Sequence, residues 1–438
     1  MSVAEVRPFR GVHYNKSLIK DWSAVICPIY DITSPQLQEE LYLRSEYNFV
    51  RLEFGRELPQ DTATDNKYTR SAATLEQWLK QGILEIDEMP AIYLHDQYFT
   101  HQGKEYKRRG LIARIRLEEW DKKVIRPHEG TMAEPKSDRL SLLATLQANT
   151  SPIWALYEDR GQRISSLLAK QEASKPLISS RAIDGESHQV WAITEPEVIN
   201  QITSSLAEQP LYIADGHHRY ESALAYQRER LTRLPLASGD EAFNFVMMEL
   251  VDFTDPGLII LPPHRLVRGI SKSTLNGLVS KLKVFFEIDK LSLSLPDVWK
   301  QVDDLLADTN EVRFVLFGLE TERLFILRLL DPSAISQMMP YFHSDIYKRL
   351  DVSIIDHVIL EKLLGMSIDK ENPTLAYSYD KQDAVKRVLV QEYQLALLVN
   401  PVKAEVIKAI ADAGDKMPRK STYFYPKLPA GLIFNRLV

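Results

Sequence analysis

The sequence predicts an α/β fold, because short apolar runs typical of buried strands alternate with segments of helical periodicity. At 438 residues, 45% of them hydrophobic, the chain is long enough for two or three domains with their own cores. The pair Pro262-Pro263 marks the expected boundary between an N-terminal α/β domain, residues 1–262, and a C-terminal α+β domain, residues 263–438. In the second domain two helical segments precede two strands.

Apolar spacing and capping residues define the first elements. A helix should start at Ser34-Pro35 and run to about Arg44, because proline at the first helical position loses no hydrogen bond. A second helix is expected from 72 to 81, ending at Gly82. Strands are expected at 25–29, 49–54, 91–99 and 111–117, the last two joined as a hairpin by the polar stretch 102–109.

From residue 137 onward helices and strands continue to alternate. Helices are expected at 137–148, 195–208 and 352–364. Strands are expected at 152–157, 189–193, 243–251, 313–317, 324–329 and 395–399. The sequence contains no internal repeat and no low-complexity segment.

The strongest candidate for a functional site is a predicted strand, turn and helix at 209–233, whose turn gathers charged and imidazole side chains. The apolar run 211–214 predicts a buried strand, and helix formers follow from Glu221. The turn between them reads Asp215-Gly216-His217-His218-Arg219. The first N–H groups of a helix have no partner within the helix, and its dipole favours an anion there. We therefore predict that residues 215–219 bind a phosphate.

The simpler interpretation of this turn is that Asp215 caps the helix and the histidines are incidental. Against it, His217, His218 and Arg219 place potential positive charge where the helix dipole disfavours it, and such local conflicts often mark functional sites. Adjacent histidines seldom point the same way, so no metal ligands are assigned. Mg²⁺ carried by a nucleotide needs only one or two protein oxygens and is still expected.

Composition excludes several classes of protein. The two glycines closest in sequence, Gly103 and Gly110, are too far apart for a P-loop, a dinucleotide fingerprint or a kinase Gly-rich loop. A net charge of −6 argues against a nucleic-acid partner. No apolar run is long enough for a membrane span, and residues 1–9 do not form a signal peptide. With Cys27 as the single cysteine, we expect a cytoplasmic protein without a disulfide; its oligomeric state is left open.

Two further polar stretches are candidates for the site. His128-Glu129-Gly130-Thr131 precedes Lys136, Asp138 and Arg139, although it could equally be a solvated loop. The segment 416–427 carries four basic residues and no acidic one, and Tyr423-Phe424-Tyr425 is too apolar for a disordered tail. We expect this tail to be ordered, with Lys420 and Lys427 positioned to meet an anion.

Several phrases resemble those of one protein family. Ala214 to Glu221, reading ADGHHRYE, looks like the signature of a large bacterial family of unknown function. The resemblance extends in the same order to residues 28–31, 128–131, 136–139, 261–265 and 417–427. More distantly, the Asp-Gly-His-His-Arg core is similar to the phosphate-binding turn of the ParB/sulfiredoxin superfamily, which includes nucleotide-dependent free serine kinases.

The distant resemblance implies a ParB/sulfiredoxin-like phosphate-binding core in which residues 215–219 hold a nucleotide phosphate. It also implies a carboxylate base elsewhere, for which Glu129 is our candidate, although its surroundings differ from the kinases' own pattern. Sulfiredoxin activity is excluded because histidine stands where that enzyme needs cysteine. DNA-partition activity is not expected from an acidic chain with no evident helix-turn-helix.

The sequence is therefore interpreted as a phosphotransferase that uses ATP or ADP with Mg²⁺ and acts on a small hydroxyl metabolite, with free L-serine the first guess. His217, His218 and Arg219 would neutralise charge on the transferred phosphoryl group, and Glu129 would accept the proton. The phosphate-binding set is Asp215, Gly216, His217, His218, Arg219, Lys420, Ser421 and Thr422, and the substrate-side set is Thr131, Lys136, Asp138 and Arg139. The alternatives are a nucleotide hydrolase with the same phosphate site and a non-enzymatic nucleotide-sensing regulatory protein.

Overall fold

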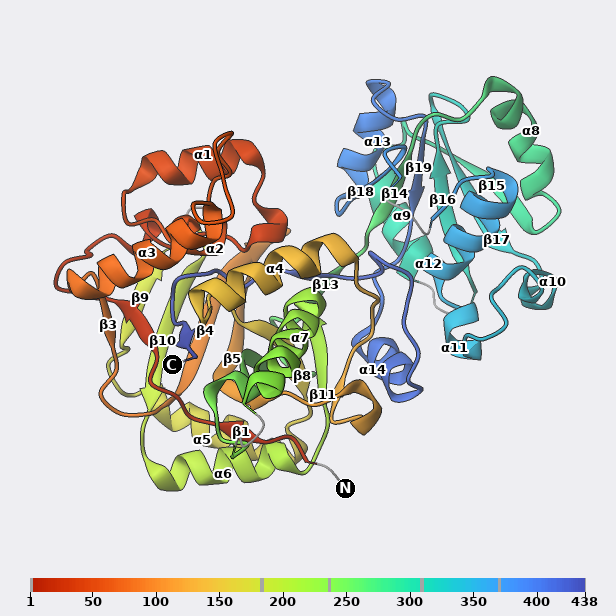
Figure 1. The fold of residues 1–438 in the computed structure, drawn as a ribbon. Helices are drawn as coiled ribbons and strands as arrows, with labels where there is room; N and C mark the ends of the chain where they lie inside the picture. Colours follow the sequence, from red (N-terminus) through yellow and green to blue (C-terminus); the bar gives the residue numbers. More distant parts are fainter. Residues whose placement is uncertain (1–2, 182–184, 235–237, 308–310, 369–371, 438) are drawn as a thin grey trace. The chain divides into compact units, whose positions relative to one another are not determined.

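The computed structural model describes residues 3–181, 185–234, 238–307, 311–368 and 372–437, and the chain forms two compact units (Figure 1). The first unit comprises Met1–Pro127, Thr131–Ile259 and Pro426–Val438. The second comprises His128–Gly130 and Ile260–Tyr425. The end of the chain is thus part of the first unit, although residues 260–425 separate it from the rest of that unit. The division at residue 262 stays a prediction.

A nine-stranded mixed sheet organises the described part of the first unit. Its strands follow the order β6-β11-β8-β12-β5-β4-β10-β9, and β1 pairs with one end of β5. The pairs β11–β6 and β12–β8 are parallel, and the others are antiparallel. The strands are β1 (Val6–Arg7), β4 (Ile92–His101), β5 (Lys104–Arg116), β6 (Ile125–Arg126), β8 (Ile153–Tyr157), β9 (Ile178–Arg181), β10 (Ser187–Ile193), β11 (Leu211–Asp215) and β12 (Phe245–Asp252).

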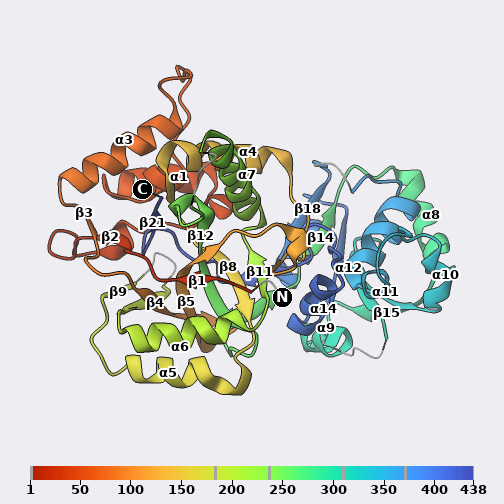
Figure 2. The same cartoon turned by 60° about the horizontal axis from the view of Figure 1, so that its bottom comes forward.

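Helices and the chain ends cover this sheet and create two hydrophobic cores. One core contains side chains of α5, α6 and α7, and the other contains side chains of the N-terminal helices and of residues 430–434. Figure 2 shows α5 and α6 running side by side below the sheet. The helices are α1 (Pro35–Arg44), α2 (Val50–Glu53), α3 (Lys67–Lys80), α4 (Ala133–Leu146), α5 (Arg163–Gln171), α6 (Pro196–Ala207) and α7 (His217–Arg233). The short pairs β2 (Val12–Tyr14) with β3 (Leu84–Ile86) and β7 (Ala148–Asn149) with β21 (Asn435–Arg436) complete the unit.

The second unit is a six-stranded antiparallel sheet between two layers of helices. Its strand order is β15-β17-β16-β19-β14-β18. One face packs on α8 and the helical segment 351–363, and the other packs on α9 and α13. The strands are β14 (His264–Val267), β15 (Phe286–Ser292), β16 (Arg313–Phe317), β17 (Arg323–Leu329), β18 (Leu375–Ser378) and β19 (Leu395–Leu398), with short strands β13 (Ile259–Leu261) and β20 (Tyr423–Tyr425). The helices are α8 (Lys272–Leu282), α9 (Val298–Ala307), α10 (Pro332–Ser336), α11 (Asp345–Lys348), α12 (Asp351–Ile354), a π-helix (Ile355–Leu363), α13 (Lys381–Leu389) and α14 (Ala404–Asp412).

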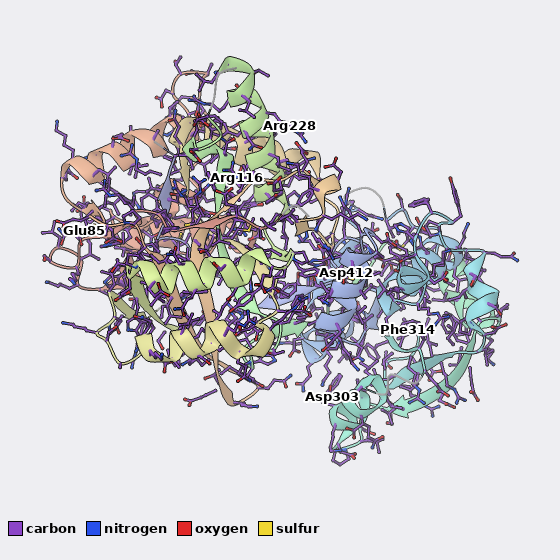
Figure 3. All side chains as sticks on the ribbon, turned by 90° about the horizontal axis from the view of Figure 1, so that it is seen from below. Glu85, Arg116, Arg228, Asp303, Phe314 and Asp412 are labelled. Atoms are coloured by element: carbon purple, nitrogen blue, oxygen red, sulfur yellow. The ribbon has the colours of Figure 1, made fainter. Side chains whose placement is uncertain are left out.

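The fold is thus mixed α/β, and most of the expected elements are confirmed. Phe314 of β16, labelled in Figure 3, lies in the buried core of the second unit. The hairpin expected at 91–117 forms as β4 and β5, with the turn at Gln102-Gly103, where φ is 49° and 76°. Positive φ at both turn residues matches the right-handed twist of the flanking strands. The polar stretch 104–109 is therefore strand rather than loop.

Two expected strands in the first unit are wrong. Residues 25–29 contribute only an isolated bridge, Cys27 to Ala430, and 49–54 form the helix α2. The side chain of Asn48 accepts a hydrogen bond from the Val50 N–H at 3.0 Å, which favours a helical turn. Burial of Phe49, Val50, Leu52 and Glu53 then overrides the alternating pattern that had indicated a strand. None of the described helices is both long and apolar enough to span a membrane.

Candidate functional site

The predicted strand, turn and helix at 209–233 form as β11 and α7, joined by Gly216. Gly216 has φ 94° and is the N-cap of α7. Only glycine adopts this left-handed backbone without strain, and a Cβ here would lie 2.9 Å from the Arg219 guanidinium. Glycine brings no side chain to cap the helix, so the N-terminal end of a 17-residue helix is built without a side-chain cap at that position. That is the geometry in which helix N–H groups can receive an anion.

Asp215 does not cap the helix. Its Oδ2 accepts a hydrogen bond from Arg219 Nη2 at 2.8 Å, and its Oδ1 forms an ion pair with Lys427 Nζ. Burial alone would raise the Asp215 pKa, but the charges of Lys427 and Arg219 outweigh it and hold the pKa well below the ordinary value. Asp215 is therefore an ionised, largely buried carboxylate between two cations. The interpretation that it caps α7 is wrong.

Arg219 fastens the start of α7 to the adjoining strand. Its Nη1 donates to Ser151 Oγ at 3.0 Å and to the Pro152 carbonyl at 2.7 Å, just before β8. Burial lowers the Arg219 pKa, but the charge of Asp215 outweighs this and raises the pKa above its ordinary value. The guanidinium thus has fixed protein partners, and its predicted role as a phosphate ligand stays a prediction.

Arg139, predicted on the substrate side, lines a small cavity together with Arg219. The cavity has a volume of about 40 Å³, and Asn149, Thr150 and Ser151 also line it. The Arg139 guanidinium lies 4.1 Å from the centre of the Tyr30 ring. Burial raises the Tyr30 pKa well above its ordinary value, although Arg219 and Arg139 act to lower it. Residues 28–31, 136–139 and 215–219, far apart in sequence, therefore meet in the first unit.

Asp138 and Arg139 belong to a network of ion pairs. Asp138 accepts from Arg139 Nε at 2.8 Å and pairs with Lys67 Nζ at 2.6 Å. Arg139 Nη1 also donates to the Glu53 carbonyl at 2.9 Å. Burial would raise the Asp138 pKa, but these two cations lower it overall. The network joins α2, α3 and α4, so these residues have structural partners whether or not they touch a substrate.

Thr131 and Lys136 both contact Glu221, which was not predicted from the sequence as a site residue. Thr131 Oγ1 donates to Glu221 Oε2 at 2.6 Å, and Lys136 Nζ lies 2.9 Å from the same oxygen. In addition, the Met132 N–H donates to His218 Nε2 at 2.9 Å. A nitrogen that accepts this bond carries no proton, so His218 is neutral while the bond forms. The segment 131–136 is thus held to the first two turns of α7.

Glu129 and the tail residues 420–422 lie together in the second unit. Glu129 Oε1 accepts from the N–H groups of Ser421 and Thr422, both at 3.2 Å, and from Thr422 Oγ1 at 3.0 Å. His128 Nε2 also lies 3.0 Å from Thr422 Oγ1. Lys420 is exposed and has φ 55°, a left-handed backbone that is uncommon outside glycine. Glu129 therefore orders the 420–422 loop, and its role as a base stays a prediction.

Lys427 is the tail residue that contacts the 215–219 turn, through its ion pair with Asp215. That Lys420 and Lys427 meet the anionic group of a ligand stays a prediction. The adjoining backbone is also fixed, because Arg108 Nη2 donates to the Pro426 carbonyl at 2.8 Å. Three partners of the predicted residues were not predicted from the sequence: Glu221, Ser151 and Glu53. Glu221 stands within the ADGHHRYE phrase, which is the one signal that could have drawn attention to it.

The residues present fit a magnesium ion only as an accessory of a nucleotide. In the part of the chain that the structure describes, no group of three or more His, Cys, Asp or Glu side chains could hold a metal ion. Ionised Asp215 offers carboxylate oxygens, which Mg²⁺ prefers, and one such ligand suffices when phosphates supply the others.

The fold and the site together define a mixed α/β protein with a buried charged cluster around a helix start. The sequence matches the family described as "Protein of unknown function (DUF1015)" over residues 6–353, and the chain belongs to this family. A search of curated proteins gave no match.

Solved structures with a similar arrangement include a free serine kinase in complex with AMP, at 14% identity and a TM-score of 0.35, covering 74% of this chain and 92% of that chain. A conserved hypothetical protein from Pyrococcus furiosus is 14% identical, with a TM-score of 0.35; the match covers 75% of this chain and 95% of that chain. SbnI with a C-terminal truncation, from Staphylococcus aureus, is 9% identical, with a TM-score of 0.34; the match covers 73% of this chain and 85% of that chain. Likenesses this distant leave open what this chain binds, and the ParB/sulfiredoxin-like assignment stays a prediction.

Proposed function

We propose that this protein binds the phosphates of a nucleotide at the 215–219 turn and transfers a phosphoryl group to a small hydroxyl metabolite. The observation that carries the proposal is the helix start of α7, which has glycine as its N-cap and a charged cluster of Asp215, Arg219 and Lys427 beside it. A helix start of this kind favours phosphate through its N–H groups and its dipole.

Several residues of the first unit would each have a separate role toward the bound phosphate. The N–H groups at the start of α7 would hold phosphate oxygens, and Lys427 would share its ammonium group between Asp215 and the phosphate. Asp215 would keep Lys427 and Arg219 charged and fixed, so that little reorganisation is needed when charge develops on the phosphoryl group. Mg²⁺, bound with the nucleotide, would neutralise phosphate charge. His218 would donate from Nδ1 if it acts on the ligand, because Nε2 accepts the Met132 N–H.

The acceptor is proposed from the sequence alone. Free L-serine is the first compound to test, because the Asp-Gly-His-His-Arg core resembles the turn of free serine kinases. Glu129 is proposed as the base that accepts the hydroxyl proton. Lys420, Ser421 and Thr422 are proposed to bind phosphate.

A product assay tests the proposal. The full chain is incubated with Mg²⁺, ATP or ADP, and a panel of hydroxyl metabolites that includes L-serine, and phosphorylated products are measured by mass spectrometry. The proposal expects a phosphorylated metabolite that depends on both nucleotide and acceptor. Release of phosphate without such a product would instead identify a hydrolase. Tight nucleotide binding without turnover would identify a sensor.

A matched pair of glycine variants locates the activity. Gly216→Ala introduces a Cβ against the Arg219 guanidinium at a positive φ, whereas Gly277→Ala in α8 meets nothing within 4 Å. Gly216→Ala should abolish product formation, and Gly277→Ala should leave it unchanged. A fully active Gly216→Ala enzyme would contradict a phosphate site at this turn.

A further inference from the structure

A large cavity lies within the second unit. Its volume is about 910 Å³, at the upper end of the range for small-molecule sites. Apolar side chains form much of its wall, among them Leu306, Val312, Ile335, Leu350, Ile354 and Val406. These side chains come from α9, α10, α12 and α14 and from the residues that precede β16 and α12. Residues 311–406 supply all the charged groups discussed below.

Among the residues that the structure describes, three charged side chains that line this cavity form neither a hydrogen bond nor an ion pair. They are those of Asp351, Arg349 and Lys403. The other charged side chains of the lining have partners: Arg313 Nη2 lies 2.7 Å from Glu311 Oε2, and Asp331 accepts a hydrogen bond from the Ser333 N–H at 2.8 Å. The cavity therefore presents one unpaired carboxylate and two unpaired cations beside an apolar wall.

Asp351 is the unusual member of this set. Burial raises its pKa to about 7, and no neighbouring cation or hydrogen bond lowers it again. A cationic group of a ligand could therefore pair with Asp351 without displacing a partner within the described chain. Arg349 and Lys403 are exposed, which places them where a ligand's anionic group could meet them.

From this arrangement we infer that the cavity is a binding site for a zwitterion, namely a free amino acid with an apolar side chain. The ammonium group would pair with Asp351, the carboxylate with Arg349 and Lys403, and the side chain would cover the apolar wall around Ile335 and Ile354. Nothing in the proposed phosphoryl transfer uses this cavity, so the inference stands independently of that proposal.

Titration calorimetry on the full chain tests the inference, with L-leucine and L-phenylalanine as probes. At least one of them should bind, and the Asp351→Asn variant should weaken binding by about 10- to 100-fold, because a charge-assisted contact is lost. Asp345→Asn is the matched control, since that carboxylate also lines the cavity but its side chain is 92% exposed. The control should bind as the native chain does.

Two analogues of leucine test the inference without any substitution. The amine 3-methylbutylamine keeps the ammonium group and should still bind, whereas 4-methylpentanoate lacks it and should bind far more weakly. The inference is overturned if no apolar amino acid binds at about 10 mM. It is also overturned if Asp351→Asn binds as tightly as the native chain, or if the carboxylate analogue binds as well as leucine.

Discussion

Lys427 should anchor the end of the chain to the first unit through its ion pair with Asp215. The Lys427 side chain is 8% exposed and that of Asp215 is 15% exposed, so the pair is shielded from solvent. Breaking a buried pair typically costs about 3 to 5 kcal/mol because a charge is left uncompensated. In Lys427→Met the Asp215 carboxylate keeps Arg219 at 2.8 Å, so we expect a smaller loss, about 1 to 3 kcal/mol in the free energy of unfolding.

Urea unfolding followed by tryptophan fluorescence measures this loss mainly in the first unit. That unit contains Trp22, Trp78, Trp120, Trp154 and Trp191, and the second contains Trp299. The control Lys420→Met removes an exposed ammonium group of the same tail and should change stability by less than about 0.5 kcal/mol.

A double-mutant cycle with Asp215→Asn isolates the pair itself. The two substitutions should couple by at least about 1 kcal/mol, since residues in one ion-pair network are not additive. Additive effects, or a Lys427→Met variant as stable as the control, would refute the anchoring role of Lys427.

Three further predictions concern titration and catalysis. Because its pKa is lowered, Asp215 contributes stability that is fully present above about pH 4 and is lost as the pH falls further. The difference in stability between the native chain and Asp215→Asn should therefore shrink progressively below about pH 4 in urea titrations. Asp351 has a raised pKa, so its ionisation destabilises the folded state as the pH rises toward 7. In melting experiments Asp351→Asn should therefore be more stable than the native chain at about pH 8 and equally stable at about pH 4. The upper limit of this difference is about 4 kcal/mol in the free energy of unfolding, and solvent in the cavity reduces it. Glu129→Gln keeps an oxygen that can accept hydrogen bonds from Ser421 and Thr422, so the fold should persist. The turnover rate should fall by a factor of about 10² to 10⁴ while the nucleotide affinity stays unchanged. An unaltered turnover rate would show that Glu129 is not the base.

Local physics explains why the centre of the site could be predicted from the sequence. An apolar run followed by a glycine turn and a run of helix formers specifies a strand, turn and helix without help from distant residues, and β11 and α7 form as expected. The same holds for the hairpin at β4 and β5, whose turn residues and alternation are adjacent in sequence. The element types were predictable wherever one apolar face and its capping residues lay within the same segment.

Tertiary partners could not be predicted in this way. Lys427 pairs with Asp215 across 212 positions, and no local pattern selects Lys427 over the other basic residues of the tail. Glu221 was missed because a carboxylate in the second turn of a helix is ordinary, and only the fold brings Thr131 and Lys136 to it. The helix at 50–53 was mistaken for a strand because burial on several sides removes the usual helical periodicity.

Nucleotide binding is the measurement that tests the central claim most directly. The melting temperature of the full chain is recorded with saturating ATP, ADP and CTP, each with Mg²⁺, for the native chain and for Gly216→Ala beside Gly277→Ala. At about 100 times the dissociation constant, one nucleotide should stabilise the native chain and Gly277→Ala by roughly 2.7 kcal/mol and leave Gly216→Ala unshifted. If none of the three nucleotides changes the melting temperature of the native chain, the 215–219 turn is not a nucleotide site.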